Sequence, residues 1–448
     1  MRFLKVDSSF LKWFYFGMHI KRWLLLFVIG VTMMGLGLSY LLREVAKYSF
    51  PSEAYWVTLQ FLPYYARGAL FAGLSASLTL FAGWQLNKSL LSALVRPGRD
   101  ESLVNIIYKH RYLQRGPRVV AIGGGTGLST LLRGLKETTV NLTAIVTVAD
   151  DGGSSGRLRD ELGLPPPGDL RNCIAALADA EPLMTKLFEY RFNEGTGLKG
   201  HSFGNLFIAA MSDVAGNFEE AVRETSRVLA VRGQILPSTL ANVTLSAVTQ
   251  DDETIHGESQ ITERGSRIKK VFIHPENAQA NPDAIRAILN ADLIIVGPGS
   301  LYTSVLPNLL VHGIRRAIEM SKAVKVYACN VATQHGETDA YTVSDHYQAL
   351  YEHIDGGLFQ YVIANDNIGE APLPETLHSK PVRIDRTRVN GATIIGADVI
   401  SQENRYHHNP KKLADAVIGL YFQRHERTQF FPETDATEES EPQEAAVL

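Results

Sequence analysis

Two segments of the chain run from a short apolar stretch through clustered glycines into a helical pattern. The first is RVVAI, residues 118–122, which is followed by GGGTG and LSTLLRGLKE. The second is DLIIVGPGS, residues 292–300, which leads into VLPNLLVHGIRRAIEMS. A strand that turns through glycine into a helix begins a βαβ unit, because parallel strands need a crossover connection. The pattern predicts an α/β fold with a Rossmann-like, doubly wound, mostly parallel sheet, whose ligands bind beyond the carboxyl ends of the strands.

The same alternation of strands and helices continues through a domain that we expect to span residues 117–431. Between residues 234 and 274 the sequence pattern changes. The strand-like runs NVTLSAV, ESQIT and KKVFIHP predict an antiparallel β-hairpin insertion there. Further buried strands of the parallel sheet are predicted at residues 142–149, 325–330 and 358–365.

Composition excludes several classes of protein. A net charge of −3 and a charged fraction of 20% exclude a strongly basic nucleic-acid-binding protein, so no nucleic-acid partner is expected. Cys173 and Cys329 are the two cysteines, which exclude a disulfide framework and a thiolate zinc site. Residues 432–448 hold six acidic residues and no basic one, which predicts a disordered acidic tail.

The N-terminal part of the chain has a different character from the predicted domain. Residues 23–42 and 68–87 are two runs without a charge, each as long as a helix that crosses a bilayer. Basic residues concentrate in residues 1–22 and in the connector at residues 88–116, which predicts a transmembrane hairpin with both ends in the cytoplasm. The alternative is a cleaved signal peptide followed by a buried helix. The hairpin would hold the large domain at the cytoplasmic membrane.

The first glycine cluster has the features of a phosphate-binding turn. Glycine lets the backbone approach a ligand, and the helix that follows offers free N–H groups. Gly124, Gly125, Thr126 and Gly127 are therefore candidate ligand-binding residues. The cluster does not complete the G-x-G-x-x-G fingerprint, because Leu128 occupies the third glycine position, and it lacks the lysine of a P-loop. A tight turn that binds nothing is the alternative.

The second glycine cluster would form the other side of the same crevice. Gly299, Ser300, Tyr302 and Thr303 follow the second strand–glycine turn, as Thr126 follows the first. Asn330 ends the next predicted strand, and Thr333 comes shortly after it, so both would face the same rim.

Polar residues follow the second predicted strand. Asp150 and Asp151 could accept a hydrogen bond from a ribose or sugar hydroxyl, hold Mg²⁺, or cap the next helix. Ser154 lies in a glycine-flanked loop that is either a hydroxyl-rich ligand loop or a linker.

Two further motifs carry candidate side chains. In PPPGDLRN, Asp169 is placed to be the N-cap of the next helix, and the alternative is that Arg171 or Asn172 of this segment faces a ligand. In GHSFGN, His201 and Asn205 supply an imidazole and an amide to the cleft, or they are structural.

Taken together, the motifs resemble one family. GGGTGLSTLLRGLK, VTVADDGGSSGRLR, PPPGDLRN, GHSFGN, VGPGSLYTSVLPNLLV, NVATQHGE and YTVSDHYQA look like those of the bacterial YvcK proteins, known as gluconeogenesis factors. That family belongs to the wider 2-phospho-L-lactate transferase, or CofD-like, superfamily. The resemblance covers roughly residues 117 to 425 and implies a Rossmann-like fold. His408 matches a late family motif loosely and is a weak site candidate.

The resemblance also implies a ligand and a role. It implies binding of a UDP-sugar such as UDP-N-acetylglucosamine, and a function in cell shape and peptidoglycan synthesis during gluconeogenic growth. The glycines of the first turn would bind the nucleotide, and the acidic and hydroxyl residues would face the sugar or a metal. Many members begin at the first strand, so the predicted transmembrane hairpin marks a membrane-attached version.

Three functional hypotheses follow. The favoured one is a UDP-sugar sensor without turnover that signals to cell-wall regulatory proteins, with a homo-oligomer as an open question. The second is a transferase that uses Mg²⁺, for which Asp150 and Asp151 are the candidate ligands. A nicotinamide-dependent dehydrogenase is disfavoured by the incomplete fingerprint.

Overall fold

The computed structural model describes residues 113–179, 182–368 and 379–430, together with scattered residues between Val31 and Phe81. The chain divides into two compact units, Met1–Tyr112 and Leu113–Leu448. Most of the two predicted membrane spans, residues 23–42 and 68–87, lies outside the described residues, as does the predicted tail at residues 432–448. Among the residues that are described, no helix combines the length and apolar character needed to cross a membrane.

The second unit is built on an eight-stranded sheet, which is mostly parallel as the sequence predicts. The strand order is β10-β11-β9-β8-β7-β1-β2-β3, and every pair is parallel except β10 with β11. The strands are β1 (Val119–Gly123), β2 (Leu142–Val146), β3 (Gln234–Pro237), β7 (Leu293–Val296), β8 (Val324–Ala328), β9 (Tyr361–Asn365), β10 (Arg388–Val389) and β11 (Ala392–Ala397).

The strand order places a switch point between β1 and β7. From β1 the chain moves outward on one side to β2 and β3, and it then returns to β7 and moves outward on the other side to β8 and β9. Ile122 of β1 is in register with Ile145 of β2 and with Val296 of β7, so these strands end together. In a doubly wound sheet such a point leaves a crevice at the carboxyl ends of the strands.

Helices cover the sheet and pack through apolar faces. Leu128, Leu131, Leu132 and Leu135 of α5 are fully buried, and α5 also packs closely on α16. The helices are α5 (Gly125–Leu135), α6 (Gly153–Leu162), α7 (Gly168–Leu177), α8 (Pro182–Glu189), α9 (Phe203–Ala215), α10 (Phe218–Val228), α11 (Glu258–Arg264), α12 (Pro282–Leu289), α13 (Leu306–Leu310), α14 (His312–Met320), α15 (Val343–His353) and α16 (Pro410–Phe430).

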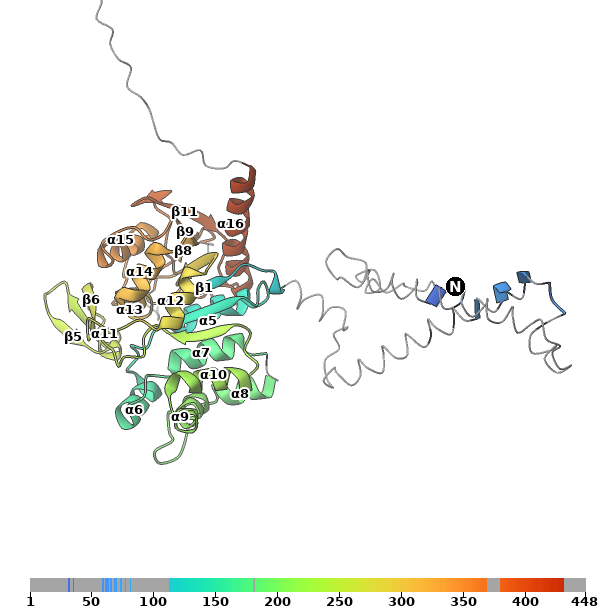
Figure 1. The fold of residues 1–448 in the computed structure, drawn as a ribbon. Coiled ribbons are helices and arrows are strands. Elements are labelled where there is room, and N and C mark those ends of the chain that lie inside the picture. The colour runs from blue at the N-terminus through green and yellow to red at the C-terminus, as the bar shows by residue number, and fades with distance from the viewer. Residues whose placement is uncertain are drawn as a thin grey trace, which may run out of the picture. The chain divides into compact units, whose positions relative to one another are not determined.

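The predicted insertion is a second, three-stranded antiparallel sheet with the order β5-β4-β6. Its strands are β4 (Thr244–Thr249), β5 (Thr254–His256) and β6 (Ile268–His274). The run ESQIT, expected as a strand, is instead the start of α11. A left-handed Gly257 and a carboxylate from outside the insertion start this helix, and neither is visible as local periodicity. Figure 1 shows α11, β5 and β6 together at one end of the domain and α16 at the other.

A second local correction concerns the helix after β7, which was expected to be continuous from Val305. The chain first makes a π-helical turn over Leu301–Val305, then α13, and then a break at Val311 before α14. π-helical turns are rare and are often found at functional sites.

Candidate functional site

The two glycine turns meet at the switch point. A side chain at Gly127 would place its Cβ 2.4 Å from the carbonyl oxygen of Pro298, so only glycine fits between the turns. Asn308 links the two turns, because its Nδ2 donates hydrogen bonds to the carbonyl oxygens of Gly123 at 3.1 Å and of Ser304 at 2.9 Å. The turns expected to form two sides of a crevice are therefore one continuous surface.

The second turn is also tied to the loop after β8. Asn330 holds both polar groups of Gly299, because its Oδ1 accepts from the N–H at 3.0 Å and its Nδ2 donates to the carbonyl at 2.8 Å. The hydroxyl of Ser300 donates to Oε1 of Gln334 at 2.6 Å. Ser300 and Asn330 thus shape the backbone of the turn.

The two residues that follow Leu301 point into the protein. Tyr302 is 2% exposed, and its hydroxyl lies 2.9 Å from that of Tyr341. Thr303 is buried and donates to Glu337 at 3.5 Å. These two predicted candidates build the wall behind the turn.

Glu337 is a buried carboxylate that was not among the site residues expected from the sequence. Its Oε1 accepts from Nε2 of Gln334 at 2.5 Å, and its Oε2 has no hydrogen-bond partner among the described residues. Burial raises the pKa of Glu337 to about 7. It belongs to the quoted motif NVATQHGE, but nothing local in that motif predicts its burial.

Asp169 lies directly under the first glycine turn. A Cβ on Gly124 would lie 2.5 Å from Oδ2 of Asp169, and the N–H of Gly125 donates to the same carboxyl group. Burial first, and then the nearby Asp150, raise the pKa of Asp169 to about 7. The N-cap position of α7 is Pro167, so the interpretation of Asp169 as the cap of its own helix is wrong.

Asp150 and Asp151 have different roles although they are adjacent. Oδ1 of Asp150 accepts from the N–H of Gly152 at 2.9 Å, which closes a local turn. The two oxygens of Asp151 accept from the N–H groups of Glu258 at 3.1 Å and Ser259 at 2.8 Å. Asp151 therefore caps a helix, as one interpretation held, but that helix is α11 of the distant insertion.

These bonds bear on the predicted Mg²⁺ site. Because both carboxylate oxygens of Asp151 are held by backbone N–H groups, Asp150 and Asp151 do not present one chelating face. In the described part of the chain, no group of three or more His, Cys, Asp or Glu side chains has the arrangement of a metal site.

Glu258 is the second residue that sequence reasoning missed. It is the first residue of α11, and the capping by Asp151 brings it close to Asp150 and Asp169. Burial and then those acidic neighbours raise the pKa of Glu258 to about 8. Helix α11 also touches the loop that carries Glu337, since a Cβ on Gly336 would lie 2.3 Å from Cα of Gly265.

The segments around α6, α7 and α9 bring the remaining polar candidates together. The hydroxyl of Ser154 lies 3.0 Å from Nδ1 of His201 and 3.1 Å from Nδ2 of Asn205. Arg171 of α7 donates to the hydroxyl of Ser202 at 2.6 Å and to Oδ1 of Asn172 at 2.7 Å. Asn172 is thus engaged within its own helix, whereas Ser154, His201 and Asn205 form a connected group.

Three other candidates have local roles or are open to solvent. Thr126 is exposed in the first turn of α5. Thr333 exchanges two hydrogen bonds with the backbone of Lys380, one through its N–H at 2.7 Å and one through its hydroxyl at 2.9 Å. His408 is buried, and its Nε2 donates to the carbonyl of Cys329 at 3.1 Å. Burial lowers the pKa of His408 to about 4, which fits a neutral structural histidine.

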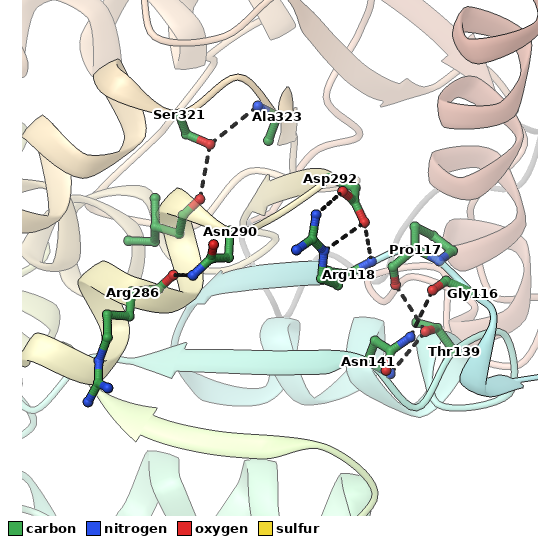
Figure 2. Close-up of polar contacts among 11 residues, drawn as sticks. Gly116, Pro117, Arg118, Thr139, Asn141, Arg286, Asn290, Asp292, Ser321 and Ala323 are labelled. Carbon is green, nitrogen blue, oxygen red and sulfur yellow. Dashed lines mark hydrogen bonds and ion pairs between the residues drawn. The ribbon is translucent and has the colours of Figure 1, made fainter.

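A cavity of about 500 Å³ lies at the opposite, amino edge of the sheet. Arg118 beside it makes a two-point contact with Asp292, through Nε at 3.2 Å and Nη2 at 2.7 Å (Figure 2). Arg286 in its wall is likewise paired with Asp283. The candidate site is assigned to the carboxyl edge despite this cavity, because the charges of the amino edge are already paired. The polar residues that line the cavity are Arg118, Asn141, Thr143, Gln234, Asp283, Arg286 and Asn290.

Comparison with known proteins agrees with the fold. Residues 119–402, well over half of the chain, match the family model described as 2-phospho-L-lactate transferase CofD. The chain belongs to the CofD family. Both glycine turns and the acidic residues around them fall within the matched residues.

Relatives within the CofD family are close in sequence. The gluconeogenesis factor of Bacillus subtilis is 48% identical over 310 residues, which cover 68% of this chain and 98% of that protein. A protein of Nostoc sp., named as a candidate gluconeogenesis factor, is 47% identical over 433 residues, which cover 92% of this chain and 93% of its own length. The Nostoc match extends beyond Leu113–Leu448 into the N-terminal unit, whereas the shorter match has the length of the CofD domain alone.

A solved structure supports the same assignment. The crystal structure of a UPF0052 family member from Bacillus halodurans superposes with a TM-score of 0.64 and 45% identity, and the match covers 68% of this chain and 99% of that chain. The Rossmann-like α/β architecture predicted from sequence is confirmed for the CofD domain.

Proposed function

We propose that the CofD domain binds a UDP-sugar, UDP-N-acetylglucosamine in particular, at the carboxyl edge of its sheet. Its role would be regulatory, linking the supply of this precursor to cell shape and wall synthesis during gluconeogenic growth through cell-wall regulatory proteins. The observation that carries the proposal is the contact between the two glycine turns at the switch point, where Gly127 meets Pro298. A phosphate can approach the backbone closely there because no side chain intervenes.

Helix N-termini favour an anion at this edge. Helices α5, α6 and α7 all begin beside the acidic residues described above, at Gly125, Gly153 and Gly168. The free N–H groups and the dipole of a helix start stabilise negative charge. Raised pKa values leave Glu258 largely protonated and Asp169 about half protonated near neutral pH, so these carboxyl groups can donate hydrogen bonds to ligand oxygens and repel them less than two full charges would.

Binding without turnover is supported by the side chains at this edge. Group transfer needs a nucleophile with a base, or a metal that activates the acceptor. Asp151 is engaged as a helix cap, and Ser300 and Asn330 hold the second turn. What remains is suited to recognition through backbone groups, hydroxyls and amides.

A transferase is the second candidate, and the match to the CofD model favours it. An Mg²⁺ ion would neutralise the diphosphate of the donor substrate. Backbone N–H groups hold both carboxylate oxygens of Asp151 and one oxygen of Asp150, so the fit of this pair to a two-aspartate metal site is poor.

The binding proposal is tested with two glycine variants that have the same backbone strain. Gly125 and Gly163 have left-handed φ values of 62° and 69°, and alanine at either costs about 1–2 kcal/mol of stability. Only Gly125 lies in the turn. We expect UDP-N-acetylglucosamine to bind the full chain in calorimetry, Gly125→Ala to weaken it at least about tenfold, and Gly163→Ala to leave it unchanged. Equal affinities in all three proteins, or preferential binding of NAD, would contradict the proposal.

Turnover is tested separately. The full chain is incubated with UDP-N-acetylglucosamine, Mg²⁺ and a bacterial metabolite extract, and release of UDP and UMP is followed. We expect none above the rate without protein. Release that is lost in Asp150→Asn would establish the transferase instead.

We also propose that residues 23–42 and 68–87 anchor the protein in the cytoplasmic membrane with the CofD domain on the cytoplasmic side. The extended match to the Nostoc protein supports an N-terminal unit shared with some relatives. The protein should stay with membranes through high-salt and carbonate washes. Release into either wash, or labelling of a C-terminal tag from outside intact cells, would contradict the anchor.

A further inference from the structure

Three buried side chains form a hydrogen-bonded group between the starts of α6 and α9. Ser154 and His201 are each 4% exposed, and Asn205 is 1% exposed. The hydroxyl oxygen of Ser154 lies 3.0 Å from Nδ1 of His201 and 3.1 Å from Nδ2 of Asn205. Because all three are held by helix starts, their geometry is set by the fold.

The donor directions in this group follow from the chemistry of each atom. The amide nitrogen of Asn205 can only donate, so the oxygen of Ser154 accepts from it. The described contacts of the Ser154 hydroxyl are with Asn205 and His201 alone, so Nδ1 of His201 is the acceptor that they offer to its hydrogen, and we assign the bond in that direction. In a neutral imidazole that accepts at Nδ1, the proton resides on Nε2.

The surroundings keep the ring neutral. Burial and then Arg157 lower the pKa of His201, with Glu161 opposing them and Arg191 acting in the same direction. These groups come from α6 and from the segment after α8, and they are the charged groups that face the ring. A neutral ring near pH 7 has one donor, which is Nε2–H.

The residue that follows His201 in the chain also helps to hold the imidazole ring in place. Ser202, the next residue, is the N-cap of α9, and Arg171 donates to its hydroxyl at 2.6 Å. Among the described residues no group hydrogen-bonds to Nε2 of His201, and this nitrogen keeps some exposure to solvent. The donor is therefore left for a ligand, whereas the hydroxyl of Ser154 and the amide nitrogen of Asn205 are engaged within the group.

We propose that Ser154 and Asn205 are positioning residues that hold His201 as the neutral Nε2–H tautomer, so that His201 donates a hydrogen bond to an oxygen atom of the bound nucleotide sugar. The proposal rests on the proposed function and adds the direction of one recognition contact to it. It makes Asn205 the residue that sets the polarity of the group, that is, which atom donates and which accepts in each of its hydrogen bonds. Asn205 does not itself touch the ligand.

Reversing that polarity is the test. In Asn205→Asp the donor becomes an acceptor, so the hydroxyl of Ser154 turns toward it and accepts from Nδ1–H of His201. Nε2 then presents a lone pair to the ligand oxygen. We expect the affinity of the full chain for UDP-N-acetylglucosamine to fall about 50-fold at about pH 8. Lowering the pH to about 5.5 favours the doubly protonated ring, because the new carboxylate stabilises the imidazolium, and most of the loss should be recovered.

A double variant separates the histidine from the new carboxylate. Gln at position 201 offers an amide donor that does not titrate, so Asn205→Asp combined with His201→Gln should show no recovery at low pH. Recovery in the double variant equal to that in Asn205→Asp alone would assign the pH effect to the carboxylate and overturn the proposal. So would an affinity of Asn205→Asp within about threefold of the wild type at pH 8. Melting temperatures are measured to confirm that each variant is folded.

A readout without ligand keeps the two proposals distinguishable. The ring nitrogen shifts of His201, in the full chain labelled at histidine and assigned with His201→Gln, report which nitrogen carries the proton. We expect Nε2–H in the wild type and Nδ1–H in Asn205→Asp. An Nδ1–H ring in the wild type overturns this inference, whereas a wild type with the expected tautomer that binds no UDP-sugar overturns the proposed function.

Discussion

The two edges of the main sheet differ in the surroundings of their charged groups. At the carboxyl edge, Asp169, Glu258 and Glu337 are largely withdrawn from water, and burial raises the pKa of each. At the amino edge, Arg118 is exposed and paired with Asp292 beside a cavity of about 500 Å³ (Figure 2). Desolvated acids destabilise a fold, whereas exposed ion pairs contribute little in either direction. Unfavourable burial of acidic groups therefore favours the carboxyl edge as the candidate site, although the cavity lies at the amino edge.

Glycine substitutions give the largest expected effects and act at both edges. Gly127→Ala would bring Cβ to 2.4 Å from the carbonyl oxygen of Pro298 at the carboxyl edge, and Gly233→Ala would bring it to 2.3 Å from that of Leu142 at the amino edge. Each clash involves backbone, so urea denaturation should show losses on the order of 2–4 kcal/mol in both variants. Only Gly127→Ala should lose the thermal stabilisation that we expect from UDP-N-acetylglucosamine under the proposed function. Equal loss of this ligand-induced stabilisation in both variants would contradict a functional difference between the two edges.

The features that could be predicted from sequence are the locally encoded ones. Glycines after short apolar runs fixed the expectation of parallel strands, and β1 and β7 do meet with their turns in contact. The acids at positions 258 and 337 were missed because their burial depends on the insertion packing across the edge. Asp151 reaches the N–H of Glu258 over 107 positions of sequence, a contact that no local pattern contains. The run ESQIT was predicted as a strand for a similar reason. It begins a helix because Asp151, which is far away in the sequence, accepts hydrogen bonds from the first N–H groups of that helix.

The pH dependence of stability should be dominated by the carboxyl edge. Burial raises the pKa of Asp169 to about 7 from an ordinary 3.8, so the folded state holds this proton more tightly than the unfolded state. Its unfavourable contribution is therefore absent below about pH 4, grows as the pH rises to about 7, and stays constant above that. Asp169→Asn removes it and should stabilise the protein by a few kcal/mol at pH 8, with little change at pH 4. Urea midpoints measured across that range test this, and a gain independent of pH would contradict it.

A buried hydroxyl at the amino edge should matter for stability alone. Thr139 is fully buried, its hydroxyl donates to the carbonyl of Pro117 at 3.0 Å, and it accepts from the N–H of Asn141 at 3.0 Å (Figure 2). Thr139→Val keeps the shape but leaves both backbone groups without this partner, so it should cost about 1–3 kcal/mol. Thr139→Ser restores the hydroxyl and serves as the control. The affinity for UDP-N-acetylglucosamine should not change in either variant, and a loss in Thr139→Val would show that the edges are coupled.

The smallest effect is expected from the ion pair that closes the amino edge. The side chains of Arg118 and Asp292 are 59% and 30% exposed, so water and salt screen their attraction. Asp292 also accepts from the backbone N–H of Arg118 at 2.8 Å, a bond that Asp292→Asn can keep and Asp292→Ala cannot. Asp292→Asn should shift the urea midpoint slightly at low salt and not at all at high salt, because it removes charge alone. Asp292→Ala should cost more, and by the same amount at both salt concentrations, because it removes the acceptor of a backbone group at the start of β1. A large, salt-dependent loss in Asp292→Asn would mean that charge at the amino edge matters as much as it does beneath the glycine turns.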